Sequence, residues 1–430
     1  MAVGELVIKG GRVIDQHGER AADVLVRDGV VAEVGAGLSA ATTLDASDCV
    51  VTPGLVDLHT HLREPGMEEA ETVASGARAA ALGGYTAVVA MPNTDPPIDS
   101  ASVAGHVLAL GRDALCDVHA AGAITLGRAG EALAPMGELH DRGVRLFTDD
   151  GDCVADARLM RRALEYARAL PGAVVAQHCE EPSLVEGGHM HEGAWSSRLG
   201  VAGRPAAAEE VVVARDLALA RATGGRIHFL HLSSAAAVAL VRDAKASGVA
   251  VTAEVTPHHL VLTDASCATW DPAFKVNPPL RTDADVAALR EGLADGTIDA
   301  VATDHAPHPP EAKDQPFSEA PPGMLGLETA LAVILTELVG PGVLDLETAL
   351  ARLSWGPAAI AGLDGHGEPI EPGSAANLCV IDPAATWEVD ATALASRARN
   401  TPWAGRKLTG RVRHTVLHGE PTVIDGEAQG

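Results

Sequence analysis

Two histidines and an arginine alternate at the end of an apolar run between residues 51 and 66, VTPGLVDLHTHLREPG. His59, His61 and Arg63 are spaced two residues apart, so in a β-strand all three side chains point to the same face. Two imidazoles on one face can bind one metal ion, and a fixed cation beside that ion can hold an anion. The spacing therefore predicts a site that activates water and binds an anionic substrate.

Further polar side chains follow the other apolar runs of the chain. Neutral imidazoles and carboxylates are the ligands typical of zinc, and there are more of them than one catalytic ion needs. We therefore expect two metal ions that share a bridging carboxylate and a bridging water. Asp304 would serve both as a ligand and as the base that takes the proton from that water. The polar residues at these strand ends are Asn93, Asp149, Asp150, His178, His231, His258, His259, Asp304, His305 and His308.

The bridging carboxylate has three candidates in one loop, Asp149, Asp150 and Asp152. An Asp in a turn often accepts hydrogen bonds from backbone N–H groups, so one of the adjacent pair is expected to cap the loop instead. His258 and His259 could pack beneath the site rather than bind metal. The residues by themselves leave these alternatives open.

The elements that position these groups alternate between strand-like apolar runs and Ala-rich helical stretches. Eight such β/α units are typical of a TIM barrel, in which functional residues lie at the carboxyl ends of the strands. Short strand patterns at both ends of the chain predict a small antiparallel sheet to which both ends contribute. The eight strand candidates are residues 50–59, 85–93, 116–125, 143–151, 173–180, 227–234, 249–259 and 298–308.

The predicted fold class is α/β, a (β/α)8 TIM barrel with a small β-sandwich domain. The barrel is the metal-dependent hydrolase domain and spans residues 53–365, while residues 1–52 and 366–430 together form the sandwich. The segment 309–322 is rich in proline and charge and lacks periodicity, so we expect a mobile loop near the site.

The charge and the cysteines restrict the class of protein. A formal net charge of -26 argues against nucleic acid and anionic membranes as partners, and leaves a small-molecule substrate. No run reaches the ~18 apolar residues that a membrane helix needs. The six cysteines form no CxxC pair, which favours reduced thiols and a cytoplasmic protein.

A set of longer motifs carries a resemblance to a known family. HTHLREPG, MPNTDPP, FTDDG, HCEE, HLSS, TPHHL, KVNPPLR, DHAPH and GLET occur in this order from residue 59 to residue 329, and NTPWAGRKLTGRV follows. The chain resembles the type I bacterial dihydroorotases of the amidohydrolase superfamily. This resemblance implies the reversible, zinc-dependent cyclisation of N-carbamoyl-L-aspartate to (S)-dihydroorotate plus water in de novo pyrimidine (UMP) biosynthesis.

The resemblance also implies roles for individual residues. One zinc ion would be held by His59, His61 and Asp304. A second would be held by His178 and His231, with Asp150 as the bridge. It further implies a homodimer and a possible complex with aspartate transcarbamoylase. The substrate would be bound by His61, Arg63, Asn93, Asn277, His308, Pro322 and Gly323.

Hydantoinases, dihydropyrimidinases and allantoinases share the barrel and the HxH strand, but resemble one another in using a carboxylated lysine as the bridge. This chain has five lysines, and none lies between Asn93 and His178, where the third and fourth strands must end. The aspartates of TDDG take that place, which favours the type I dihydroorotase. The alternatives are another cyclic amidohydrolase of the hydantoinase or allantoinase kind, and a non-catalytic relative that binds aspartate transcarbamoylase.

Overall fold

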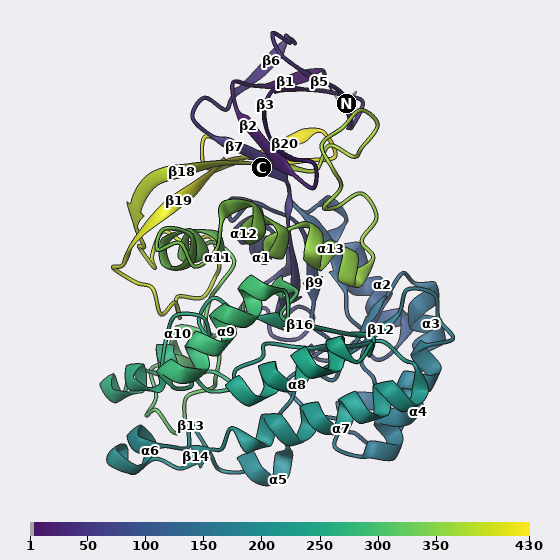
Figure 1. The fold of residues 1–430 in the computed structure, drawn as a ribbon, viewed down its shortest axis with the longest axis vertical. Helices are drawn as coiled ribbons and strands as arrows, with labels where there is room; N and C mark the ends of the chain where they lie inside the picture. The colour runs from purple at the N-terminus through teal and green to yellow at the C-terminus, as the bar shows by residue number, and fades with distance from the viewer. Residues whose placement is uncertain (1–3) are drawn as a thin grey trace.

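The computed structural model describes residues 4–430 and shows a mixed α/β protein. The strands from both chain ends lie together at one end of the molecule, at the top of Figure 1. The helices that follow the central strands cover the opposite part.

Eight parallel strands make up the central part. The first sheet contains β8 (Leu55–Thr60), β9 (Tyr85–Ala90) and β10 (Asp117–Ala120). The second contains β11 (Leu146–Phe147), β12 (Val174–Gln177), β15 (Ile227–Phe229), β16 (Val251–Val255) and β17 (Ala300–Val301). Isolated parallel bridges pair Gly122 with Phe147 and Thr60 with His305, at the two places where the sheets adjoin. The carboxyl ends of all eight strands therefore lie on one side.

Most residues of the central strands are buried on both faces, as expected when helices or side chains cover each face of a parallel sheet. Every residue of β8 and of β9 is buried. Two observed strands are much shorter than predicted: β11 has two residues within the predicted strand 143–151, and β17 has two within 298–308. Their polar ends leave the ladder; Asp304, for example, has φ 47°, which is outside the β region.

Helices follow most of these strands. Several begin at a Ser, Thr or Asp whose side chain accepts from the first-turn backbone; Thr72 and Ser75, for instance, form a capping box at α1. In α4, Leu159, Met160, Ala163, Leu164 and Ala167 form one buried face. The helices of eight or more residues are α1 (Val73–Leu82), α2 (Ala101–Leu110), α4 (Ala157–Ala167), α7 (Ala207–Thr223), α8 (Ala235–Ala246), α9 (Asp283–Asp295) and α12 (Leu346–Leu353).

Shorter elements fill the connections. The short helices are α3 (Met136–Asp141), α5 (Pro182–Val185), α6 (Ala194–Leu199), α10 (Pro310–Lys313), α11 (Ala330–Ile334) and α13 (Trp355–Ala361). A small parallel pair, β13 (Met190–His191) with β14 (Gly203–Arg204), lies in the excursion after β12. The helical turns are η1 (Gly111–Asp113), η2 (Leu126–Arg128), η3 (Asp264–Thr269), η4 (Pro272–Phe274) and the π-helical η5 (Leu335–Val339).

The terminal strands form two sheets. One has the order β5 (Val30–Gly35), β4 (Asp23–Arg27), β1 (Leu6–Lys9), β6 (Thr42–Asp45). The other has the order β21 (Glu427–Ala428), β20 (Glu420–Ile424), β19 (Lys407–Leu417), β18 (Leu378–Glu388), β7 (Val50–Pro53), β2 (Arg12–Asp15), β3 (Gly18–Ala21). β7 pairs antiparallel with β18, so both chain ends contribute to this sheet.

The prediction of a purely antiparallel arrangement is wrong. β1 pairs in parallel with β6, and β2 pairs in parallel with β7. A tight hairpin forces antiparallel pairing only on consecutive strands, whereas these pairs are separated by several intervening strands and are free to run either way.

The segment 309–322 is less irregular than the sequence predicts, because α10 occupies Pro310–Lys313. Proline is favoured at the first helical position, where its missing N–H is not needed. Lys313 Nζ donates to the carbonyl oxygen of Pro272 at 3.0 Å, which ties the segment to η4, and to that of Pro321 within the segment at 2.8 Å. Its mobility stays a prediction.

Two structural findings concern membrane-spanning helices and the state of the cysteines. Within residues 4–430 we find no helix with the length and apolar character needed to cross a membrane. All six cysteines fall in this range, and each is a free thiol.

Candidate active site

A cavity of about 230 Å³ opens at the carboxyl ends of the central strands. Each predicted metal ligand or substrate-binding residue lines it except His59, which is fully buried and contacts the cavity wall at Asp150. The residues that line it are His61, Arg63, Asn93, Asp150, Gly151, His178, His231, Val276, Asn277, Asp304, Ala306, His308, Pro322 and Gly323.

One group of donor atoms surrounds Oδ2 of Asp150. His59 Nε2 lies 3.3 Å from this oxygen, and His61 Nε2 lies 3.5 Å from it. The same two nitrogens lie 3.6 and 3.0 Å from Oδ1 of Asp304. Strands β8, β11 and β17 thus bring two imidazoles and two carboxylates to one point.

A second group surrounds the other oxygen of Asp150. Its Oδ1 lies 3.6 Å from His178 Nδ1 and 3.5 Å from His231 Nε2. The two ring nitrogens are 3.0 Å apart. Asp150 therefore presents one oxygen to each pair of histidines, which is the arrangement of a bridging carboxylate.

The residues present fit metal ions. His59 Nε2 and Asp150 Oδ1 are buried and have no hydrogen-bond partner among residues 4–430. Buried polar atoms nearly always have a partner, so unpaired atoms directed at a common point need an explanation. Each group has three donor atoms within mutual reach, and imidazole nitrogen with carboxylate oxygen is a typical donor set for zinc.

Three of the four histidines have their remaining ring nitrogen held by an outer partner, whereas His231 Nδ1 has none among the described residues. His59 Nδ1 lies 2.8 Å from Glu254 Oε1, and His61 Nδ1 lies 2.9 Å from Asn93 Oδ1. His178 Nε2 lies 3.2 Å from Glu180 Oε2. Such contacts fix the ring orientation and the nitrogen that is left for a metal.

The two glutamates among these partners were missed by the sequence reasoning. Glu254 interrupts the apolar run 249–259, and Glu180 follows His178 in HCEE. A carboxylate inside a buried strand is rare unless it is paired, so Glu254 carried a signal that could have found it.

Three site residues have a left-handed backbone, namely His231 at φ 31°, Asp304 at φ 47° and Arg63 at φ 64°. Non-glycine residues adopt this region only where the surrounding structure enforces it, and such residues cluster at functional sites. The turns direct the three side chains away from the strand ladder and into the cavity.

The carboxylates of the site are anionic at neutral pH. Burial opposes the charge of Asp150, but the nearby imidazoles of His59, His178 and His231 hold its pKa well below the usual range. Burial likewise opposes the charge of Asp304, yet its bond to His61 and the nearby His59 keep its pKa far below the ordinary value.

Arg63 supplies the positive charge. Burial lowers the pKa of Arg63 to about 10, so it stays charged at neutral pH. Within the described chain its guanidinium donates only through Nε, to the carbonyl of Pro307 at 3.1 Å. The two terminal nitrogens are therefore free to form a fork with a carboxylate.

The three candidate aspartates of the loop have different surroundings in the structure. Asp149 Oδ1 accepts from the N–H groups of Ile124 and Thr125, at 2.8 and 3.0 Å, and so caps the loop. Asp152 is exposed and pairs with Arg128 at 2.5 Å. Asp150 is the one of the three that reaches the histidines.

His258 and His259 lie beside the site without joining either donor group of the described chain. Both nitrogens of His259 are engaged, Nδ1 with Thr256 Oγ1 at 2.8 Å and Nε2 with the carbonyl of Pro278 at 2.9 Å. The ring of His258 lies 4.6 Å from that of His259. His305 bonds to Glu71 at 3.3 Å instead of facing the metal ligands.

Two further substrate-binding candidates are held in place from outside the cavity. His308 Nε2 donates to the carbonyl of Pro322 at 2.8 Å. In the carboxamide orientation that satisfies its neighbours, Asn277 accepts from Arg204 at 3.1 Å and donates to the carbonyl of Val276 at 3.0 Å. This leaves one N–H of Asn277 for a ligand.

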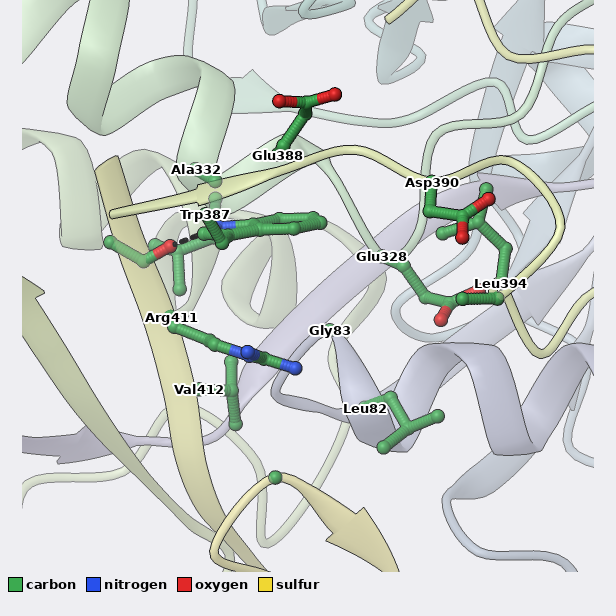
Figure 2. Close-up of a pocket in the computed structure, with 14 residues that line it drawn as sticks. Leu82, Gly83, Glu328, Ala332, Trp387, Glu388, Asp390, Leu394, Arg411 and Val412 are labelled. Atoms are coloured by element: carbon green, nitrogen blue, oxygen red, sulfur yellow. Dashed lines mark hydrogen bonds between the residues drawn. The ribbon is translucent and has the colours of Figure 1, made fainter. Parts of the chain in front are cut away.

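A second cavity of about 230 Å³ lies apart from this site, next to the long strands β18 and β19 (Figure 2). Its wall carries Trp387, Arg411, Glu328, Glu388 and Asp390, and no histidine is among the described residues that line it. The Arg411 guanidinium lies 5.8 Å from the centroid of the Trp387 ring. Figure 2 shows these two side chains in the cavity wall. Its carboxylates do not converge into a group of donor atoms within mutual reach in the described part of the chain.

The chain is similar to known dihydroorotases over nearly its full length. A family model described as dihydro-orotase-like matches residues 48–237. The dihydroorotase of Streptomyces coelicolor is 53% identical, and the match covers 99% of this chain and 100% of that protein. The dihydroorotase of Mycobacterium tuberculosis is 51% identical, with 98% and 99% covered.

A solved structure shows the same fold. The L-hydantoinase (dihydropyrimidinase) from Arthrobacter aurescens superposes with a TM-score of 0.90 at 27% identity, covering 99% of this chain and 98% of that one. The resemblance carried by the motifs is therefore confirmed, and the chain belongs to the dihydroorotase family of cyclic amidohydrolases.

Proposed function

We infer that the chain catalyses the dihydroorotase reaction, the reversible cyclisation of N-carbamoyl-L-aspartate to (S)-dihydroorotate and water in pyrimidine biosynthesis. The full-length similarity to dihydroorotases supports this assignment. The structural observation that carries it is Asp150, which faces one pair of histidines with each oxygen. An aspartate stands where the lysine-bridged amidohydrolases would need a lysine.

We propose that the site holds two Zn²⁺ ions, the first at His59, His61 and Asp304, and the second at His178 and His231. Asp150 would be shared by both. When bound, such ions lower the pKa of water to about 7 and polarise a carbonyl group. The unpaired buried atoms of His59 and Asp150 support this assignment.

Asp304 is proposed to move the proton. In ring opening a water oxygen bonds to the ring carbonyl carbon, the carbon–nitrogen bond breaks, and Asp304 carries the water proton to the leaving nitrogen. In cyclisation the same carboxylate removes the proton from the carbamoyl nitrogen. Its low pKa in the protein supports this role, since it starts ring opening as an anion.

Arg63 is proposed to bind the carboxylate that the substrate keeps throughout, through a two-point fork. Asn93 accepts from His61 through Oδ1, so its amide group is left to donate to the same substrate. Burial lowers the pKa of His308 to about 3, so it binds as a neutral imidazole. Asn277 and the backbone of Pro322 and Gly323 complete the proposed pocket.

We also propose that the central strands form a closed barrel and that the terminal sheets form a sandwich. The two bridges between the central sheets support a closed (β/α)8 barrel. One buried apolar cluster contains Ile8 and Val24 from the four-stranded sheet and Val51 and Val380 from the seven-stranded sheet, which supports a β-sandwich. We propose domain limits of 1–52 and 366–430 for the sandwich and 53–365 for the barrel. On the family resemblance, we also propose a cytoplasmic homodimer that is able to associate with aspartate transcarbamoylase.

A substrate comparison tests the function. Purified protein is assayed for ring closure of N-carbamoyl-L-aspartate and, in parallel, for hydrolysis of hydantoin and allantoin, with metal analysis of the same sample. We expect turnover of N-carbamoyl-L-aspartate in the presence of bound zinc. Turnover of hydantoin alone would favour the hydantoinase-like alternative, and no turnover of any of the three would favour a non-catalytic relative.

A further inference from the structure

Glu254 is a fully buried carboxylate on β16 that contacts residues of both donor groups. Its Oε1 accepts from His59 Nδ1 at 2.8 Å. The same oxygen accepts from the backbone N–H of His231 at 3.4 Å. One carboxylate outside the donor groups thus touches one proposed ligand of each metal ion.

The contact to His59 determines which ring nitrogen can bind a metal. A carboxylate only accepts, so the proton of the neutral ring must lie on Nδ1. The lone pair is then on Nε2, the unpaired buried atom that lies 3.3 Å from Asp150. Without Glu254 the ring could carry its proton on either nitrogen and could rotate.

The contact to His231 acts on the backbone. His231 has φ 31°, a conformation that costs a non-glycine residue free energy unless the surroundings enforce it. The bond from its N–H to Glu254 supports this turn, which directs His231 Nε2 toward Asp150 Oδ1 at 3.5 Å.

The other oxygen of Glu254 is held as well. His228 Nε2 lies 3.0 Å from Oε2, and His228 Nδ1 lies 2.8 Å from Thr252 Oγ1. The Glu254 side chain is therefore fixed at both oxygens, and its position does not depend on a metal ion.

We propose that Glu254 is a positioning residue that couples the two halves of the metal centre by orienting His59 and the backbone of His231 together. This inference rests on the proposed function. The proposal predicts that Zn²⁺ binding depends on the length of the side chain at position 254 rather than on its charge.

Two substitutions at position 254 separate the effect of side-chain length from the effect of charge. Glu254→Asp keeps the charge but withdraws the carboxylate by one methylene, so it should lose contact with His59 and His231. Glu254→Gln keeps an oxygen acceptor at the same reach, and His228 can present its other tautomer to the new amide group. Asp15→Asn is the matched control, because Asp15 is a buried, hydrogen-bonded carboxylate in the terminal sheet, far from the donor groups.

The experiment measures Zn²⁺ binding to metal-depleted full-length protein by competition with a chromophoric chelator, with no substrate present. Loss of an outer partner of a metal-bound histidine typically weakens metal binding about 10–100-fold. We expect that loss for Glu254→Asp, and binding within about threefold of the unsubstituted protein for Glu254→Gln and Asp15→Asn. For the zinc-loaded Glu254→Asp protein, kcat should fall while KM stays unchanged, because Glu254 does not touch the substrate-binding residues.

The outcomes separate this inference from the proposed function. Equal zinc affinity of Glu254→Asp and the unsubstituted protein overturns the role of Glu254, as does a Glu254→Gln protein that binds as weakly as Glu254→Asp. Failure of the unsubstituted protein to bind zinc contradicts both proposals. Normal zinc affinities without turnover of N-carbamoyl-L-aspartate contradict the proposed function but leave the role of Glu254 supported.

Discussion

The cavity at the strand ends and the cavity beside β18 and β19 enclose the same volume, about 230 Å³ each, yet differ in how their polar groups are paired. In the cavity beside β18 and β19, called the outer cavity below, Trp387 Nε1 donates to the carbonyl of Gly410 at 3.0 Å, and Glu328 accepts from the N–H of Ala395 at 2.9 Å. At the strand ends His59 and Asp150 keep buried atoms without a partner in the described chain. Convergent, unpaired donor atoms, rather than volume, distinguish the cavity at the strand ends as the candidate active site.

The largest expected effect comes from removing the shared carboxylate. Asp150→Ala should lose the bound metal and lower the rate of ring closure by more than about 100-fold, since even outer contacts of metal ligands are worth 10–100-fold. Asp152→Ala is the matched control in the same loop and should remain largely active, because its side chain is exposed. Metal analysis and steady-state kinetics of both proteins check this; the reverse pattern would move the bridge to Asp152.

Asp304→Asn should next affect the chemical step. The amide cannot take a proton from water, and general base catalysis is worth about 10²–10⁴-fold, so kcat should fall in that range. KM should change much less, because Arg63 and Asn93 remain in place. A rise in KM with kcat unchanged would show that Asp304 only binds substrate.

Arg63→Lys should weaken substrate binding while leaving the metal in place. A lysine keeps the charge but lacks the planar fork, so KM should rise roughly 10-fold or more. Measurement of kcat, KM and metal content distinguishes the outcomes. A variant with unchanged KM would remove Arg63 from the carboxylate site.

Substitutions in the outer cavity, in contrast, should hardly change the rate of ring closure. Arg411→Ala and Trp387→Phe should leave kcat/KM for ring closure within about twofold, since surface substitutions away from a site usually have small effects. A tenfold loss in either protein would mean that this cavity takes part in the reaction, and the comparison between the two cavities would fail.

The smallest effect is expected at Asp117, a carboxylate that bonds two histidines but belongs to neither donor group of the described chain. At the amino end of β10, Asp117 bonds to His366 Nε2 at 2.8 Å and to His418 Nε2 at 3.0 Å. Burial opposes the charge of Asp117, but the two histidines hold its pKa well below the usual range. Its hydrogen bond to Asp117 raises the pKa of His418.

The signs of these shifts predict a pH window for stability. The contribution of Asp117 is present above its ordinary pKa and is lost as the pH falls. That of His418 is present below the ordinary histidine pKa and is lost as the pH rises through its higher folded value. Asp117→Asn should therefore lower Tm more at pH 6 than at pH 9. The difference between the two pH values should be roughly 2 °C or less, because Asp117 is only half-buried and His418 is exposed. An equal or larger effect at pH 9 would contradict this.

Much of the site could be predicted from residue type and spacing. The period of a strand directs His59 and His61 to one side, and parallel strands bring their polar ends together, so His178, His231 and Asp304 were expected nearby. These features depend on local geometry that the sequence encodes directly. Arg63 was expected on the same strand face, but β8 ends at Thr60 and Arg63 reaches the cavity through a left-handed turn.

Other features depend on contacts between segments distant in sequence. The choice of Asp150 over Asp149 depends on which carboxylate the N–H groups of Ile124 and Thr125 can reach. The role of Glu254 depends on a partner 195 residues away along the chain. The parallel pairing of β1 with β6 likewise reflects tertiary packing that no local pattern encodes.

The central claim is that the convergent histidines and aspartates hold the metal on which ring closure of N-carbamoyl-L-aspartate depends. The direct measurement is the rate of this ring closure by protein from which metal has been removed by chelation, before and after Zn²⁺ is added back. We predict that the rate is lost with the metal and returns as zinc binds, with recovery abolished in Asp150→Ala. A metal-depleted protein that closes the ring at the full rate would contradict the account.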